Sequence, residues 1–310
     1  MTSVELYRQM LWNAWTSTSR ANPWLEEIPV SKAQLHARIS TDPFDGGKTA
    51  TWLADLEKTG TVTWRAVRDT RSGHTIHTVS DRPFVALKKD LLFGLQLMNW
   101  LSTRPIVWYW WDQPWARVLP ANVDPGRDHI NGGWAIPGTL EVHVYRREEA
   151  HKVMLHECIH ALELDVSFEA TTPVRRQFES AFGRTLWPHL GEAFTELFAE
   201  WLWSIASATS LADATKKWRY QMTCSERQAS EVWARIRDSH ENENTNVFAY
   251  YVLKWVLMEH LPIALLESKQ SVTSWYSWWL GAKPKLEILA GHAAYTESKA
   301  LSLGMTCPEH

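Results

Sequence analysis

A chain of 310 residues can bury a large core, either as one large domain or as two lobes. Its 32 basic and 35 acidic residues nearly cancel, to a formal charge of −3, so the charge balance gives no case for nucleic acid or a membrane surface as a partner. Three cysteines, Cys158, Cys224 and Cys307, are too few and too scattered for a disulfide framework or a cysteine metal site.

The sequence predicts neither a secretory signal nor a membrane span. The N-terminal residues lack a basic start followed by an apolar stretch and a small-residue cleavage site. The most apolar stretch, residues 250–266, is interrupted by Lys254, Glu259 and His260, which favours a buried helix. We therefore expect an intracellular soluble protein, although a secreted fragment that had lost its signal would have the same features.

The first half of the chain mixes helical and strand patterns. Apolar residues at helical spacing predict helices, one of them capped by Ser31, at residues 4–16, 31–39, 85–101 and 148–164. Alternating β-branched residues and short aromatic runs predict strands at residues 61–68, 74–80, 106–111, 130–136 and 139–145. The first two strands are joined by a short turn and are expected to form a hairpin.

Strand patterns end near residue 165, and the rest of the chain has helical periodicity. Helices are predicted at residues 173–183, 188–208, 211–238, 246–260 and within 270–303. We therefore predict an α+β fold of two lobes. Residues 1–165 form a mixed lobe with a small sheet and the helix 148–164, and residues 166–310 form a mostly helical lobe.

The helix 148–164 contains the sequence His156-Glu157-Cys158-Ile159-His160. Residues four apart lie on one side of a helix, so His156 and His160 can offer two imidazole nitrogens to one metal ion. Glu157 lies about 100° round the helix and can reach a water on that metal without being a ligand. This is the HExxH signature of the zincin metallopeptidases, which implies one catalytic Zn²⁺ ion and Glu157 as the general base.

A catalytic zinc usually takes three protein ligands, so the motif needs a third one. The metzincin pattern fails, because Glu163 and Val166 stand where it requires glycine and histidine. The peptide deformylase pattern is disfavoured, because neither Cys224 nor Cys307 follows the glycine that this family's cysteine ligand requires. Cys158 is expected to pack in the core.

The chain resembles the gluzincins, the group of thermolysin-like peptidases in which a glutamate on a following helix is the third ligand. The segment Gly191-Glu192-Ala193-Phe194-Thr195-Glu196 is similar to that group's pattern of a small residue, a ligand, and a second acid four residues on. The resemblance implies that Glu192 binds the zinc. It also implies that Glu196 accepts a hydrogen bond from the far nitrogen of His156.

Two alternatives to this assignment stay open. Glu179 has a spacing from His160 that is familiar from aminopeptidases of this class, although Gly183, four residues on, supplies no second acid. Alternatively, Glu192, Glu196 and Glu200 lie opposite the apolar stripe of their helix and form a solvated acidic face without any metal.

The segment before the active helix resembles the substrate-binding edge of thermolysin-like enzymes. In those enzymes an exposed edge strand pairs with the backbone of an extended peptide. The resemblance implies a substrate-binding role for Gly132, Gly133, Trp134 and Ala135, where glycine permits close backbone approach. A plain Gly-Gly turn is the alternative.

Gluzincins also place a hydrogen-bond donor opposite the zinc, where it stabilises the oxyanion. Tyr250 and Tyr251, near the start of a predicted helix, are the first candidates, followed by His240 and Arg235. A tyrosine on an apolar helix is otherwise a core residue, and this alternative stays open for both.

These residues together predict a zinc-dependent peptidase that acts on peptide or protein substrates. Glu157 would take a proton from the attacking water and pass it to the leaving amine. The sequence predicts neither a cleavage specificity nor an oligomeric state. The alternatives are a zincin fold kept as a binding or regulatory module, and a zinc hydrolase of non-peptide amides. Retention of Glu157 argues against the first, because a scaffold does not need the base.

Overall fold

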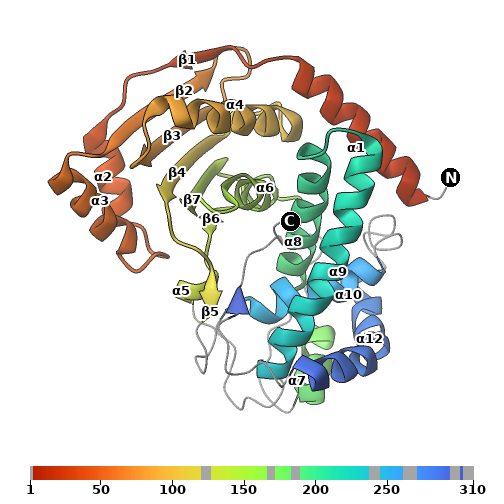
Figure 1. The fold of residues 1–310 in the computed structure, drawn as a ribbon. Coiled ribbons are helices and arrows are strands. Elements are labelled where there is room, and N and C mark those ends of the chain that lie inside the picture. The colour runs from red at the N-terminus through yellow and green to blue at the C-terminus, as the bar shows by residue number, and fades with distance from the viewer. Residues whose placement is uncertain are drawn as a thin grey trace. The chain divides into compact units, whose positions relative to one another are not determined.

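Figure 1 shows the computed structural model, which describes residues 3–119, 127–165, 172–182, 189–236, 245–260, 271–293 and 301–302. It is a mixed α+β fold with one six-stranded sheet, which confirms the predicted class. No helix within these ranges is long and apolar enough to cross a membrane.

By its internal contacts the chain divides into two compact units. The sheet unit comprises Met10–Ala116 and Asn131–Glu163, and the helical unit comprises Met1–Gln9, Arg117–Ile130 and Leu164–His310. The switch at residues 163 and 164 lies beside the boundary expected after residue 165. The sequence analysis did not assign the two earlier segments to the helical unit.

The sheet unit is built on six strands in the order β1-β2-β3-β4-β7-β6. They are β1 (Leu25–Glu27), β2 (Thr63–Asp69), β3 (Thr75–Ser80), β4 (Val107–Gln113), β6 (Gly133–Ala135) and β7 (Glu141–Arg146). β2 and β3 form the predicted hairpin, and β4 and β7 continue the sheet in parallel. β6 runs antiparallel to β7 and ends the sheet, so it is an edge strand.

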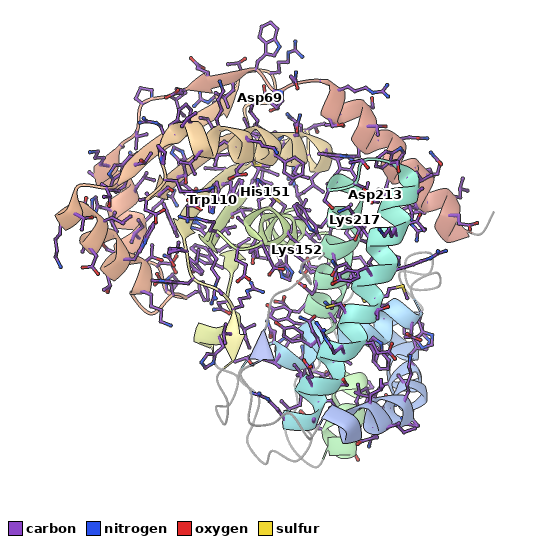
Figure 2. All side chains as sticks on the ribbon, in the orientation of Figure 1. Asp69, Trp110, His151, Lys152, Asp213 and Lys217 are labelled. Atoms are coloured by element: carbon purple, nitrogen blue, oxygen red, sulfur yellow. The ribbon has the colours of Figure 1, made fainter. Side chains whose placement is uncertain are left out.

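Helices cover both faces of this sheet. They are α2 (Lys32–Ser40) and α3 (Lys48–Thr59) on one face, and α4 (Phe84–Leu101) and α6 (Ala150–Ala161) on the other. The aromatic residues of β4 alternate between the faces. Tyr109 and Trp111 pack with α2 and α3. Trp108 and Trp110 approach the ring of His151 on α6, as Figure 2 shows for Trp110. The predicted buried strand is therefore confirmed.

Polar side chains accept hydrogen bonds from N–H groups in the first turns of α2 and α3. Ser31 Oγ accepts a hydrogen bond from the Gln34 N–H, which confirms the predicted cap of α2. Asp45 accepts hydrogen bonds from the N–H groups of Gly47 and Thr49, both at 2.8 Å, and so begins α3. Neither α3 nor β1 was predicted. β1 has only three residues, and the two glycines before α3 resemble a turn.

The helical unit contains most of the remaining elements. Its helices are α5 (Arg127–Ile130), α7 (Thr172–Phe182), α8 (Leu190–Ala206), α9 (Leu211–Ile236), the π-helix η2 (Phe248–Leu253), α10 (Lys254–Glu259) and α12 (Ser271–Ala293). β5 (Val118–Leu119) and β8 (Leu301–Ser302) pair antiparallel. The first turns of α1 (Ser3–Arg20) also belong to this unit. The rings of Trp233, Phe248 and Trp279 pack against one another in the core.

Three features of the chain differ from the sequence predictions. The helix expected at 246–260 is present, but its first turns, Phe248–Leu253, are π-helical and run directly into α10. The strand expected from residue 130 begins at Gly133, because Ile130 ends α5 and Asn131 and Gly132 connect the two elements. Cys224 is disulfide-bonded although no disulfide framework was predicted, whereas Cys158 is free and buried, as expected.

Candidate metal centre

α6 carries both histidines of the HExxH motif. Their rings meet at 70° with centroids 4.9 Å apart, and their Nε2 atoms are 3.1 Å apart. His156 is buried and His160 is half-buried. Glu157, between them in sequence, is also buried. The helical spacing of four residues therefore brings the two imidazoles to one point, as the sequence predicted.

The separation of these nitrogens fits a shared metal ion. Two nitrogens held tetrahedrally by zinc at about 2.05 Å lie about 3.3 Å from each other. The separation of 3.1 Å also permits a hydrogen bond between two neutral rings, one donating and one accepting. Measurement of bound metal distinguishes these two states.

The carboxyl end of α6 is fixed by the turn that follows the edge strand. The N–H of Gly138 donates to the Ala161 carbonyl at 3.1 Å, so one of the last carbonyls of the helix has a partner. Gly138 has a φ of 79°, a left-handed conformation that favours glycine. The hairpin formed by β6 and β7 is therefore bonded to the last turn of the helix that carries both histidines.

The edge strand also packs directly on Glu157. A Cβ atom added to Gly133 would lie 3.1 Å from Glu157 Cγ and 3.0 Å from Val153 Cγ1, both on α6. It would also lie 2.4 Å from the carbonyl oxygen of His143 on β7. Only glycine fits here without a shift of its neighbours, so this position brings β6 as close as possible to the proposed base.

The pairing register shows which groups of β6 face away from the sheet. Tyr145 N–H donates to the Gly132 carbonyl at 2.8 Å, and Trp134 is paired with His143. Because antiparallel pairs alternate, the N–H and C=O of Trp134 point toward β7. Those of Gly133 and Ala135 point outward. Gly133 lies in a strand and not in a Gly-Gly turn, whereas Gly132 precedes the strand.

Two of the three glutamates on α8 contradict the alternative of a solvated acidic face. Glu196 and Glu200 are buried, so they do not form a solvated face. The ammonium of Lys254 on α10, itself buried, lies 2.8 Å from Glu200 Oε2 and 4.0 Å from Glu196 Oε1. The apolar periodicity of α8 could not reveal this ion pair, because its cation, Lys254, lies far along the chain. Glu192, in the first turn of α8, is half-buried.

One group of three potential ligands occurs in the part of the chain that the structure describes. It consists of His156 and His160 of the sheet unit and Glu192 of the helical unit. Glu179, on α7, does not belong to this group. Two imidazoles and one carboxylate form a donor set that suits zinc.

The candidate oxyanion donors have different surroundings. Tyr251 is buried in the core of the helical unit, which supports the alternative of a packing role. Tyr250 is half-buried, and its hydroxyl oxygen accepts a hydrogen bond from Asn246 Nδ2 at 3.2 Å. Arg235 lies in the last turn of α9. His240 lies outside the described residues.

Sequence reasoning missed the residues that surround Trp134. Its indole stacks on the ring of His143 at 3.8 Å and 7°, and its Nε1 donates to Asp42 Oδ2 at 2.9 Å. Burial, and then the charge of Arg38, lower the pKa of His143 to about 3, so this ring is neutral. The partners Asp42 and Trp134 are 92 residues apart, and such a contact has no local sequence pattern.

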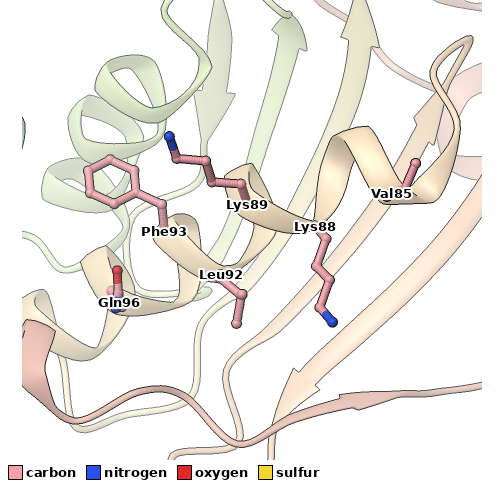
Figure 3. Close-up of a pocket in the computed structure, with 6 residues that line it drawn as sticks. All are labelled: Val85, Lys88, Lys89, Leu92, Phe93 and Gln96. Carbon is pink, nitrogen blue, oxygen red and sulfur yellow. The ribbon is translucent and has the colours of Figure 1, made fainter.

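A hollow of about 440 Å³ lies on α4 (Figure 3). It is lined by one side of that helix: Val85, Lys88, Lys89, Leu92, Phe93 and Gln96. Lysine and apolar side chains without any histidine or acid do not form a metal site.

Comparison of the chain with protein-family models, with curated proteins and with solved structures gave no match. The functional interpretation therefore depends on the geometry of the chain itself.

Proposed function

We propose that this chain is a zinc-dependent peptidase with a gluzincin-like centre and a zincin-like fold. In this proposal His156, His160 and Glu192 hold one zinc ion, and Glu157 is the general base. The strongest support is the arrangement on α6, with two Nε2 atoms 3.1 Å apart and the buried Glu157 packed against an edge strand at Gly133.

The edge strand supports a peptide as the substrate. The outward N–H and C=O groups of Gly133 and Ala135 are spaced as an added strand requires, so an extended peptide can continue the sheet. The peptide residue that pairs with Gly133 would then lie next to Glu157, because Gly133 has no side chain to keep the two apart. An amide that is not part of an extended chain would leave these backbone groups unused.

The protein residues have separate roles in this reaction. A bound zinc ion would supply a Lewis acid that polarises the substrate carbonyl and lowers the pKa of water. Glu157 would take a proton from the attacking water and deliver it to the leaving amine. In this proposal Tyr250 and not Tyr251 would donate to the oxyanion, because Tyr251 is buried in the core of the helical unit. Glu196 would accept a hydrogen bond from the far nitrogen of His156.

The test combines metal analysis with a digest of a synthetic peptide library. Wild-type protein should contain one zinc per chain and cleave peptides in a chelator-sensitive way. Glu157→Gln should keep the zinc and lose about 10²- to 10⁴-fold in kcat/KM. Glu163→Gln, the same change at an exposed residue just beyond α6, should have no effect.

Each alternative predicts a different result. Zinc binding without cleavage of any library peptide would support a binding module or a hydrolase of non-peptide amides. Full activity in Glu157→Gln would remove this residue from the mechanism. A wild-type protein that binds no zinc would contradict the proposal altogether.

A further inference from the structure

Asp42 holds the indole of Trp134 in place on the face of the sheet opposite α6. Its Oδ2 accepts from Trp134 Nε1 at 2.9 Å. Its Oδ1 accepts from the Tyr145 hydroxyl at 2.8 Å and from the Phe44 N–H at 2.9 Å. Burial, followed by the charge of Asp42, raises the pKa of Tyr145, so its hydroxyl stays protonated and remains a donor. Both carboxylate oxygens are therefore engaged.

Phe44 and Trp134 form an aromatic surface beside the edge strand. The centroid of the phenyl ring lies 5.3 Å from that of the indole, with an angle of 45° between the rings, and the indole is also stacked on His143. Phe44 is 39% exposed and Trp134 is half-buried, so the pair remains accessible to solvent. Such a surface can bury an apolar side chain, whereas a carboxylate would lose water without gaining a partner.

The strand register places a substrate side chain on this surface. Gly133 faces α6, so its neighbour Trp134 faces the opposite side of the sheet. If a peptide pairs antiparallel with the outward groups of Gly133 and Ala135, its residue opposite Trp134 forms a pair without hydrogen bonds. Side chains approach most closely in pairs of this kind, with Cβ atoms about 4.5–5.5 Å apart.

We propose that Phe44 and Trp134, positioned by Asp42, form a subsite that selects an apolar side chain of the peptide. This inference rests on the proposed peptidase function and adds a specificity to it. The selected residue is the neighbour of the one that pairs with Gly133, next to Glu157. Asp42 acts only through Trp134 and is a positioning residue.

The experiment measures a preference and then removes its proposed cause. Zinc-loaded wild-type protein digests the peptide library, and the cuts should show an excess of Leu, Phe or similar residues at one fixed position. Two peptides that differ only by Leu or Asp at that position then give a ratio of kcat/KM values. Phe44→Ala should lower this ratio about two- to ten-fold.

Two further variants separate specificity from folding. Trp24→Ala removes another exposed aromatic side chain of the sheet unit, 61% exposed, and should leave the ratio unchanged. Asp42→Asn replaces one acceptor oxygen by a donor, so the indole loses a fixed position. It should raise KM for the Leu peptide more than it lowers kcat.

The outcomes distinguish this inference from the proposed function. Cleavage without a preference at a fixed position, or a ratio that Phe44→Ala leaves unchanged, overturns the subsite and keeps the peptidase. If zinc-loaded wild-type protein cleaves no library peptide, the peptidase function is overturned, and the subsite with it.

Discussion

Replacement of Gly133 by alanine should slow hydrolysis by more than the accompanying loss of stability can explain. The added Cβ would lie 2.4 Å from the carbonyl oxygen of His143, closer than real Cβ contacts, and 3.1 Å from Glu157 Cγ. The carbonyl belongs to the backbone of β7 and cannot rotate away, so β6 must move. Overpacking of this kind costs about 1–3 kcal/mol of unfolding free energy.

The displacement should also reach the chemistry. To relieve both contacts, the edge strand and the Glu157 side chain must separate by several tenths of an ångström or more. A misplacement of about 1 Å in an active site can cost about 10²-fold in rate. We therefore expect Gly133→Ala to lose about a hundredfold in kcat/KM for a library peptide while it keeps its zinc.

Gly94→Ala is the matched control, because it overpacks the same unit elsewhere. Its Cβ would lie 2.5 Å from Cζ3 of the buried Trp108, where α4 meets the sheet. Urea unfolding followed by circular dichroism should show a similar loss of stability in both variants. Hydrolysis, assayed where both are folded, should fall strongly only in Gly133→Ala. Equal activity in the two variants would refute the contact between the edge strand and Glu157.

Two further predictions address the third ligand and acid sensitivity. Glu192→Ala should lower bound zinc well below one per chain, whereas Glu179→Ala should leave it unchanged; the reverse result would exchange their roles. The pKa of His143 is lowered to about 3, so below about pH 6.5 the unfolded chain binds a proton that the folded chain does not. The stability contribution of this ring is therefore complete above pH 6.5. It declines by about 1.4 kcal/mol per pH unit as the pH falls toward 3. His143→Phe should reduce this decline in urea unfolding between pH 7 and 5.

Local patterns predicted those elements whose residues carry their own signal. The alternating residues of β2 and β3 and the aromatic run of β4 gave the sheet, because burial on one or two faces repeats along a strand. The helical spacing of His156 and His160 gave the geometry of the two imidazoles for the same reason. α3 was missed because the Asp45 cap and its two glycines do not differ locally from a turn.

Long-range partners could not be predicted in this way. The burial of Glu196 and Glu200 depends on Lys254, and the orientation of Trp134 depends on Asp42. Each of these pairs joins distant segments, and a charge on the polar side of a helix has the same pattern whether it meets water or a counterion. The π-helical form of Phe248–Leu253 was not predicted either, because apolar spacing cannot distinguish a π-helix from an α-helix.

The hydrogen bond from the Gly138 N–H to the Ala161 carbonyl affects how the edge strand and the end of α6 open. Edge strands and helix ends are normally the parts of a fold that open first and independently. Here the turn after β6 supplies the partner of a carbonyl in the last turn of α6, so fraying of either one removes a hydrogen bond from both. This shared hydrogen bond couples the two openings by about 0.5–1.5 kcal/mol. Amide hydrogen exchange at Gly138 therefore reports on the helix that carries the histidines as well as on the strand before it.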